Sequence, residues 1–117
     1  MTDIKRWHPT ARMNQMVAYN GLVFTAGQVA EENAGKSVSE QTTEILHNID
    51  ALLAEAGSDK SRILSATIYL ADIASFAEMN TVWDTWVSAD GKPARATVEA
   101  RLTGPEYAVE ISVIAAA

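Results

Sequence analysis

Two stretches with a helical repeat of apolar residues flank a single run in which apolar and polar residues alternate. The helical stretches span residues 37–57 and 75–87, and the alternating run spans residues 62–72. Short strand-like runs precede the first helical stretch and follow the second. This order predicts an α+β fold, in which two amphipathic helices cover one face of a sheet built from several parts of the chain.

The first helical stretch carries clear signals at both ends. Ser37 and Glu40 have the spacing of a capping box, in which each side chain accepts a hydrogen bond from an N–H at the start of the helix. Gly57 is a typical stop. Between these ends, apolar residues recur every three or four positions and form one stripe: Val38, Ile45, Leu46, Ile49, Leu52, Leu53 and Ala56.

The second helical stretch repeats the same pattern. Ser75 and Glu78 have capping-box spacing, so we expect a second capping box there. We expect Trp83 and Trp86 to belong to the core rather than to form a stacking platform. The expected buried stripe is Phe76, Met79, Val82, Trp83, Trp86 and Val87.

The strand signals complete the predicted order ββαβαββ. Asn20-Gly21 lies between two apolar runs and predicts a two-residue hairpin, because both residues tolerate positive φ. Gly104-Pro105 separates the last two strands, near residues 93–101 and 107–114. In the middle strand, alternation predicts a buried face made of Leu64, Ala66, Ile68 and Leu70.

The sheet face that the helices leave free is expected to be small and semi-polar, with little charge. We expect it to carry Ser65, Thr67, Tyr69, Thr97 and Ser112. A sheet face in contact with water normally carries more charge than this. We therefore expect a partner chain to cover it, most simply another copy of the same chain.

Composition excludes several classes of function. The chain has 117 residues, a formal net charge of −6 and no cysteine. This length predicts one domain over residues 1–117. The negative charge disfavours a nucleic-acid surface, and the lack of cysteine excludes disulfides and thiolate chemistry. The sequence shows no apolar run of the roughly 18 residues a membrane span needs and no signal-peptide pattern, so we expect a cytoplasmic protein.

Motifs for metal or phosphate binding are missing from the sequence. There is no Gly-rich phosphate loop, no HExxH and no close pair of metal ligands, so we expect no metal site. His47 lies beside the stripe of the first helix and is expected to be solvated. His8 lies in the N-terminal segment, from which it could reach the rim of a pocket.

Arg95 and Glu110 are the strongest candidates for chemistry. Arg95 follows Pro93 at the start of a strand, where its planar guanidinium suits either a ligand carboxylate or an ion pair at the strand end. Glu110 lies between Val109 and Ile111 in a strand, where an unpaired charge is costly. It fits either acid/base work or a structural pair with Arg95 or Arg101. By alternation, Arg95, Thr97, Glu99 and Arg101 share one face of their strand, and Arg101 is expected at an interface or a rim.

Four short segments carry a resemblance to a known family. "PARATVEARL" followed by "VEISVIA", and preceded by "TAGQV" and "FAEMN", resembles the RidA/YjgF family of reactive intermediate deaminases. The resemblance runs from about Gln15 to the C-terminus. The short N-terminus, the "ATIYLAD" strand and the Trp-rich second helix resemble its small YoaB-like branch.

The resemblance implies a fold, an assembly and a reaction. The fold would be chorismate-mutase-like, in a homotrimer with three clefts, each lined by two subunits. Archetypal members hydrolyse 2-imino acids, or their enamine tautomers, to 2-keto acids and ammonia without a metal or organic cofactor. By this resemblance, Arg95 would bind the substrate carboxylate and Glu110 would activate the attacking water. Gly27 would present a backbone amide to the pocket, and Asn80 and Thr97 would line it.

Two positions depart from the archetypal pattern. Met13 stands about where archetypal members have a tyrosine, and Ala26 stands where they have a serine. Both are substrate-binding positions, so losing the two hydroxyls bears on substrate choice and on turnover. A non-catalytic trimeric module that binds a small carboxylate is therefore the alternative to a deaminase. A nuclease activity, as ascribed to some distant relatives, is disfavoured by the charge of −6.

Overall fold

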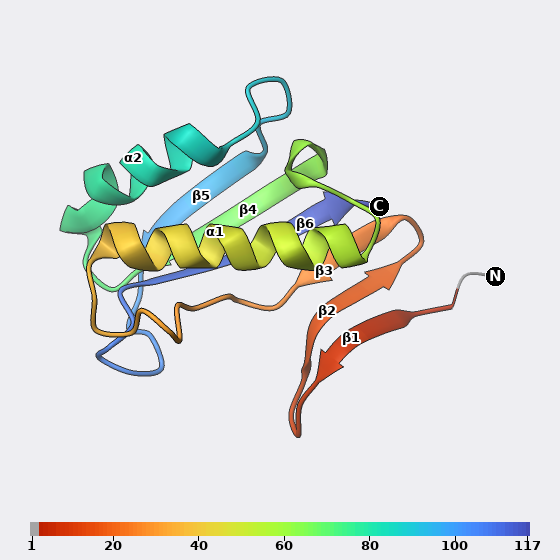
Figure 1. The fold of residues 1–117 in the computed structure, drawn as a ribbon, viewed down its shortest axis with the longest axis horizontal. Coiled ribbons are helices and arrows are strands. Elements are labelled where there is room, and N and C mark those ends of the chain that lie inside the picture. The colour runs from red at the N-terminus through yellow and green to blue at the C-terminus, as the bar shows by residue number, and fades with distance from the viewer. Residues whose placement is uncertain (1–2) are drawn as a thin grey trace.

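Two α-helices lie across the same face of a six-stranded sheet (Figure 1). The computed structural model describes residues 3–117. Its strands are β1 (Lys5–Pro9), β2 (Asn14–Tyr19), β3 (Leu22–Thr25), β4 (Ile63–Leu70), β5 (Ala94–Glu99) and β6 (Val109–Ala116). Its helices are α1 (Val38–Glu55) and α2 (Phe76–Trp86), with 3₁₀ turns η1 (Lys60–Arg62) and η2 (Ile73–Ser75). The predicted α+β class and the helices on one face are confirmed.

Strand β1 is an addition to the predicted order. It pairs antiparallel with β2, which makes the observed order βββαβαββ. Of its five residues, only Trp7 is even partly buried. An exposed edge strand lacks the apolar alternation by which strands are recognised in sequence, so the pattern gave no signal for β1.

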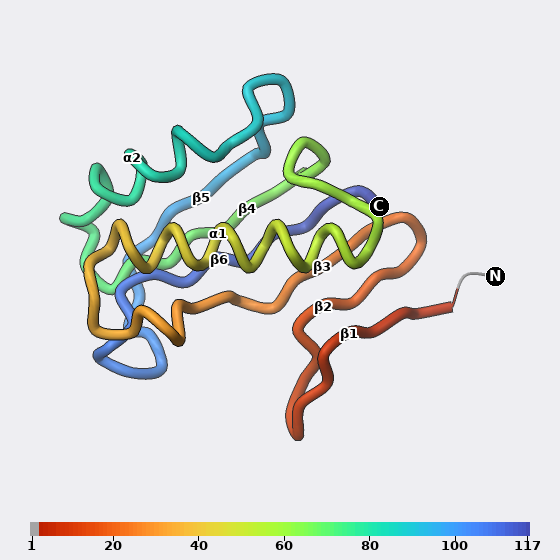
Figure 2. The backbone as a smooth tube through the Cα atoms, viewed as in Figure 1, coloured from red at the N-terminus to blue at the C-terminus, as the bar shows by residue number. Residues whose placement is uncertain are grey.

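The strand order places β6 inside the sheet and β5 at its edge. The order is β1-β2-β3-β6-β4-β5, and β4 with β5 is the parallel pair in an otherwise antiparallel sheet. Parallel neighbours need a crossover, and α2 supplies it (Figure 2). Consequently Glu110 lies on an interior strand and Arg95 on an edge strand.

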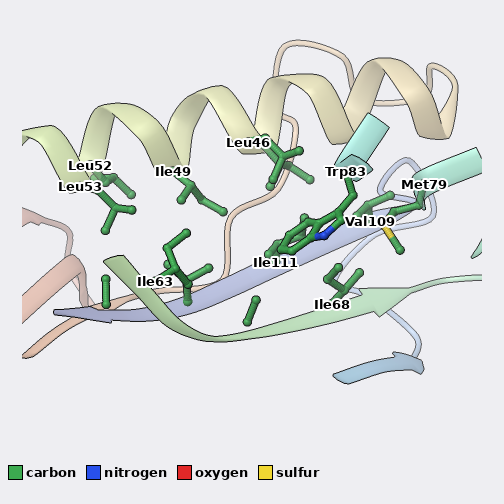
Figure 3. Close-up of a cluster of buried hydrophobic side chains, with 14 of the residues drawn as sticks. Leu46, Ile49, Leu52, Leu53, Ile63, Ile68, Met79, Trp83, Val109 and Ile111 are labelled. Carbon is green, nitrogen blue, oxygen red and sulfur yellow. The ribbon is translucent and has the colours of Figure 1, made fainter. Parts of the chain in front are cut away.

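Helix α1 begins and ends as its sequence predicts. The hydroxyl of Ser37 accepts a hydrogen bond from the Glu40 N–H at 3.1 Å, and the Glu40 carboxylate accepts one from the Ser37 N–H, which confirms the capping box. Gly57 follows the helix with φ of 75°. The apolar stripe of α1 packs on β6 and β3, beside α2, and forms much of the core (Figure 3).

Helix α2 departs from its prediction at its start. Ser75 makes no side-chain cap, and the Glu78 carboxylate instead accepts hydrogen bonds from the N–H and hydroxyl of Ser39, each at 3.0 Å. The predicted second capping box is therefore wrong, because Glu78 ties α2 to the first turn of α1. Phe76 is 41% exposed rather than buried, whereas Trp83, at 5%, belongs to the core as predicted.

A bulge changes which face Leu64 occupies. The register between β4 and β6 shifts between Ile63 and Ser65. As a result Ile63 is buried and Leu64 is 51% exposed, so the predicted burial of Leu64 is wrong. Beyond the bulge, Ala66, Ile68 and Leu70 alternate toward the helices as predicted.

The sheet face opposite the helices, here called the open face, is largely apolar. In the described part of the chain both helices lie on the other side (Figure 1). Thr97 is in register with the buried Ile68, so it faces the helices, and its predicted place on the open face is wrong. The open face carries Tyr19, Leu22, Phe24, Leu64, Thr67, Tyr69, Val98, Glu110, Ser112 and Ile114.

No helix within residues 3–117 is long and apolar enough to span a membrane.

Candidate functional site

A β-bulge lies beside Glu110. Phe24 pairs with Ile114 and Gln28 pairs with Ile111, so four steps along one strand (24 to 28) match three along the other (114 to 111). The extra residue is accommodated between Thr25 and Gln28, at Ala26 and Gly27. Bulges re-aim the backbone next to functional sites. Here the bulge brings Gly27 against the side chain of Glu110.

The Glu110 carboxyl packs directly against the backbone of Gly27. A methyl group added at Gly27 would overlap that carboxyl, whose carbon Cδ lies 2.8 Å from the position of the added carbon. Any larger side chain would displace the carboxyl. The structure thus brings together two residues that the sequence assigned to one site, and we call Ala26, Gly27 and Glu110 the Glu110 cluster.

The Glu110 carboxylate has no cationic partner within residues 3–117. Its side chain makes no hydrogen bond or ion pair there, and the one contact with salt-bridge geometry among the described residues joins His8 to Glu55. Its cross-strand neighbour is Tyr69 on β4. Within a single chain, Glu110 therefore does not form the structural ion pair with Arg95 or Arg101 that was the alternative to a role in chemistry.

Arg95 lies under α2 on the other face of the sheet. Its Nη1 donates a hydrogen bond to Asn80 Oδ1 at 2.8 Å. Its guanidinium carbon lies 5.2 Å from the centre of the Trp83 ring and 5.7 Å from that of Phe76. No carboxylate within residues 3–117 lies close enough to form an ion pair with Arg95. The half-buried cation therefore keeps its charge available for an anion.

Thr97 shares the face of Arg95 two residues along β5. Its Oγ1 is buried and has no hydrogen-bond partner among the described residues. A buried hydroxyl without a partner is costly and uncommon in folded proteins. Asn80, Arg95 and Thr97, which we call the Arg95 cluster, therefore combine a free cation with an unsatisfied polar atom.

The two clusters do not meet in one chain. Arg95 is in register with Ala66, which is 1% exposed and faces the helices. Glu110 is in register with Tyr69, which faces the opposite way. Strand β4 lies between them. A site that uses both side chains needs a second copy of the chain.

Met13 lies in the exposed turn between β1 and β2. Its backbone N–H and C=O both bond to Thr10, and its side chain is 44% exposed. Two residues later, the Gln15 C=O accepts a hydrogen bond from the N–H of Ala26 at 2.8 Å. Met13 is thus on the hairpin that pairs with the Glu110 cluster, with its side chain free to meet another molecule.

The remaining candidates lie away from both clusters. The side chain of His8 forms a hydrogen bond with the Glu55 carboxylate at 2.7 Å. It therefore contacts the end of α1 and not either cluster. His47 is exposed, as predicted. Arg101 lines a hollow of about 720 Å³ together with Glu99 and Tyr107, among other residues. Within residues 3–117, no three His, Cys, Asp or Glu side chains gather closely enough to hold a metal ion.

Gln41 is a structural residue that the sequence reasoning missed. It is 1% exposed, its Nε2 donates to the C=O groups of Lys36 and Glu106, and its Oε1 accepts from the Ala108 N–H at 2.8 Å. It therefore anchors the segment that leads into Glu110. Its place on the apolar stripe of α1, between Val38 and Ile45, is the signal that would have found it.

Comparison with known proteins agrees with this architecture. The family described as Endoribonuclease L-PSP matches residues 3–117. A RutC family protein of Haemophilus influenzae is 47% identical over 112 residues, covering 96% of this chain and 97% of the relative. The RutC family protein YoaB of Escherichia coli is 45% identical over 113 residues, covering 97% of each. A YjgF family member from Neisseria meningitidis has a solved structure with a TM-score of 0.94 and 50% identity, covering 97% of this chain and 94% of that one.

The chain shares the fold of its solved relative: a chorismate-mutase-like α+β fold, in which both helices lie on one face of a mixed sheet. The chain belongs to the RidA/YjgF family, and it is YoaB-like.

Proposed function

We propose that the chain is a cofactor-free hydrolase that converts 2-imino acids, or their enamine tautomers, to 2-keto acids and ammonia. The reaction would take place at clefts between subunits of a homotrimer. One observation carries the proposal: Arg95 and Glu110 each lack a charged partner, and they lie on opposite faces of the sheet. Two neighbouring copies, one giving each residue, would complete a site.

Arg95 is the proposed anchor for the substrate carboxylate. A guanidinium binds a carboxylate through two parallel hydrogen bonds, which fixes the orientation of the ligand as well as its position. Asn80 holds one nitrogen of the guanidinium at 2.8 Å. The Thr97 hydroxyl lies on the same face, and its buried oxygen has no hydrogen-bond partner among the described residues. The Arg95 cluster thus supplies orientation rather than chemistry.

Glu110 is the proposed acid/base group. Its carboxylate takes a proton from a water molecule while the water oxygen attacks the electrophilic carbon of the C=N bond. It then delivers that proton to the nitrogen, which gives a carbinolamine. In a second transfer the carboxylate takes the proton of the new hydroxyl group and delivers it to the nitrogen, so that the C=O bond forms, the C–N bond breaks and ammonia leaves. Since an imine carbon is already electrophilic, orientation and one acid/base group are sufficient for such a reaction. Gly27 keeps space for the carboxyl, and by the family resemblance its backbone N–H is proposed to face the substrate.

The open face is the proposed trimer interface. Five large apolar side chains on it are more than a third exposed in the single chain: Tyr19, Leu22, Phe24, Leu64 and Val98. An apolar surface of this kind is typical of a protein–protein interface. The same face carries Glu110, so association would bring this carboxylate to a neighbouring chain.

Ammonia release from 2-iminobutyrate, generated in place by an amino-acid oxidase, tests the proposal. The wild type is expected to accelerate release, and Arg95→Ala is expected to fall to the uncatalysed rate. If the wild type does not exceed the uncatalysed rate, the deaminase proposal is wrong.

A non-catalytic carboxylate-binding module is the second candidate. Met13 and Ala26 favour it, because they remove two hydroxyls that help line the archetypal pocket. Under this alternative, 2-oxobutyrate would bind in an Arg95-dependent way while the wild type released no ammonia. The family description as an endoribonuclease suggests RNA as a substrate, but a net charge of −6 opposes it. An unchanged mobility of the protein with RNA at low salt would exclude RNA binding.

A further inference from the structure

We propose that Phe76 and Trp83 are positioning residues, which hold the guanidinium of Arg95 in the orientation that receives a ligand carboxylate. The inference rests on the proposed role of Arg95 as the carboxylate anchor. It adds two aromatic side chains that act through Arg95.

Three side chains on one face of α2 contact Arg95. Phe76, Asn80 and Trp83 are spaced four and three residues apart, so they lie in line on one face of the helix. All three contact the guanidinium: Asn80 by its hydrogen bond, and the two rings at 5.7 Å and 5.2 Å from its central carbon. Both ring distances are within the range of a cation–π interaction.

The exposure of Phe76 fits this role better than a role in the core. Trp83 is 5% exposed and is part of the core, but Phe76 is 41% exposed although it falls on the predicted buried stripe. A phenylalanine that leaves the core while lying over a cation is explained by its contact with that cation. The buried ring and the exposed ring therefore restrain Arg95 from the inside and from the outside.

The rings and a carboxylate use different parts of the guanidinium. Aromatic rings attract a cation placed over their faces, whereas a carboxylate accepts hydrogen bonds in the plane of the guanidinium. Nη1 is bound to Asn80, while Nε and Nη2 have no partner among residues 3–117. These two nitrogens lie along one edge of the group and form a free two-point fork. Ring contact and carboxylate binding can thus occur together.

A guanidinium that is already held in place binds a carboxylate more tightly, because its side chain loses less conformational freedom on binding. Arginine side chains are flexible, and ordering one on binding opposes association. If the rings already hold Arg95 in one orientation in the free protein, its side chain loses less conformational entropy when the ligand binds. Removing one ring should weaken carboxylate affinity without changing the chemical step at Glu110.

The test compares Phe76→Leu with Phe76→Tyr. Phe76→Leu is expected to raise KM for 2-iminobutyrate, and Kd for 2-oxobutyrate by calorimetry, about three- to tenfold, with kcat changed by less than about twofold. Phe76→Tyr keeps the aromatic face and is expected to recover the wild-type affinity. Ile73→Ala is the control, since Ile73 is 46% exposed near the same end of α2 but supplies neither a ring over Arg95 nor a hydrogen bond to it.

Two outcomes overturn the inference: a Phe76→Leu affinity equal to that of the wild type, or equal losses in the leucine and tyrosine variants. Its failure is distinguishable from that of the proposed function. If the wild type releases no ammonia but binds 2-oxobutyrate, the deaminase proposal fails, and the leucine–tyrosine difference in Kd still decides the role of Phe76. If the wild type binds no carboxylate, both are wrong.

Discussion

Arg95 and Glu110 point away from each other across a single sheet. Arg95 is in register with the buried Ala66 under α2, and Glu110 is in register with Tyr69 on the open face. Each lacks a charged partner in residues 3–117. The proposed site therefore takes its carboxylate anchor and its acid/base group from different copies of the chain, and the two residues should fail in different ways when changed.

Substituting the two residues should separate binding from turnover. Glu110→Gln keeps the size of the side chain but cannot accept a proton from water, so kcat should fall by about 10²- to 10⁴-fold while 2-oxobutyrate still binds. Arg95→Ala should weaken 2-oxobutyrate binding by about 10- to 100-fold, because it removes hydrogen bonds to a charged group, and should also abolish turnover, because the substrate is no longer oriented toward the acid/base group. Calorimetry and ammonia release measure the two effects. Loss of 2-oxobutyrate binding in Glu110→Gln would contradict the assigned roles.

Gly27→Ala should impair activity more than stability. The added methyl overlaps the Glu110 carboxyl, which is the end of a flexible side chain and can rotate away. We expect the free energy of unfolding to fall by about 1 kcal/mol or less, at the low end of overpacking effects. Turnover should fall by at least about tenfold, because the carboxyl leaves its position. Urea unfolding and ammonia release check the two halves.

The control for Gly27→Ala is the same change in a Glu110→Ala background. With the carboxyl removed, the added methyl has space, so the double variant should be as stable as Glu110→Ala alone. A stability loss of the same size in both backgrounds would show that the methyl meets something other than Glu110.

Phe24→Glu should break the assembly. Phe24 is 39% exposed on the open face, where a carboxylate would be buried without a partner on association. We expect the dissociation constant of the oligomer to rise by at least about tenfold, measured by sedimentation. Ile73→Glu is the matched control, because Ile73 is as exposed but lies in η2, outside the sheet. Equal effects of the two changes would argue against the open face as the interface.

Ser37→Ala should destabilise the fold by about 1 kcal/mol, since it removes the hydroxyl that caps α1. Ser75→Ala should change the free energy of unfolding by less than about 0.5 kcal/mol, because Ser75 makes no cap at α2. Urea unfolding at one protein concentration compares them. A larger loss for Ser75→Ala would contradict the assignment of the caps.

Local signals were sufficient to predict α1 together with its cap, whereas at α2 they predicted the helix but not the contacts at its start. The capping box, apolar stripe and Gly57 of α1 all depend on residues close in sequence. At α2 the spacing of Ser75 and Glu78 is the same, yet Glu78 bonds to Ser39, which is distant in sequence. A tertiary contact thus overrides the local pattern. The bulge that exposes Leu64 depends in the same way on pairing between β4 and β6.

Candidate site residues could be named from the sequence, but their arrangement could not. Alternation along a strand tells which residues share a face, but not which face that is in a neighbouring strand. The pairing of β5 with β4 turns Arg95 and Thr97 toward α2, and the pairing of β6 with β4 turns Glu110 away. This register arises only when the chain folds. Consequently the sequence named both residues without revealing that one chain keeps them apart.

Mixing two inactive variants tests most directly whether neighbouring chains share the site. Arg95→Ala and Glu110→Ala chains are each expected to be inactive alone, and are unfolded together and refolded as mixed oligomers. In a random mixture about a quarter of the sites would join an intact Arg95 to an intact Glu110, so ammonia release should recover to about a quarter of the wild-type rate. If mixed oligomers form but no activity returns, while refolded wild type is active, the two residues do not meet between subunits and the account is wrong.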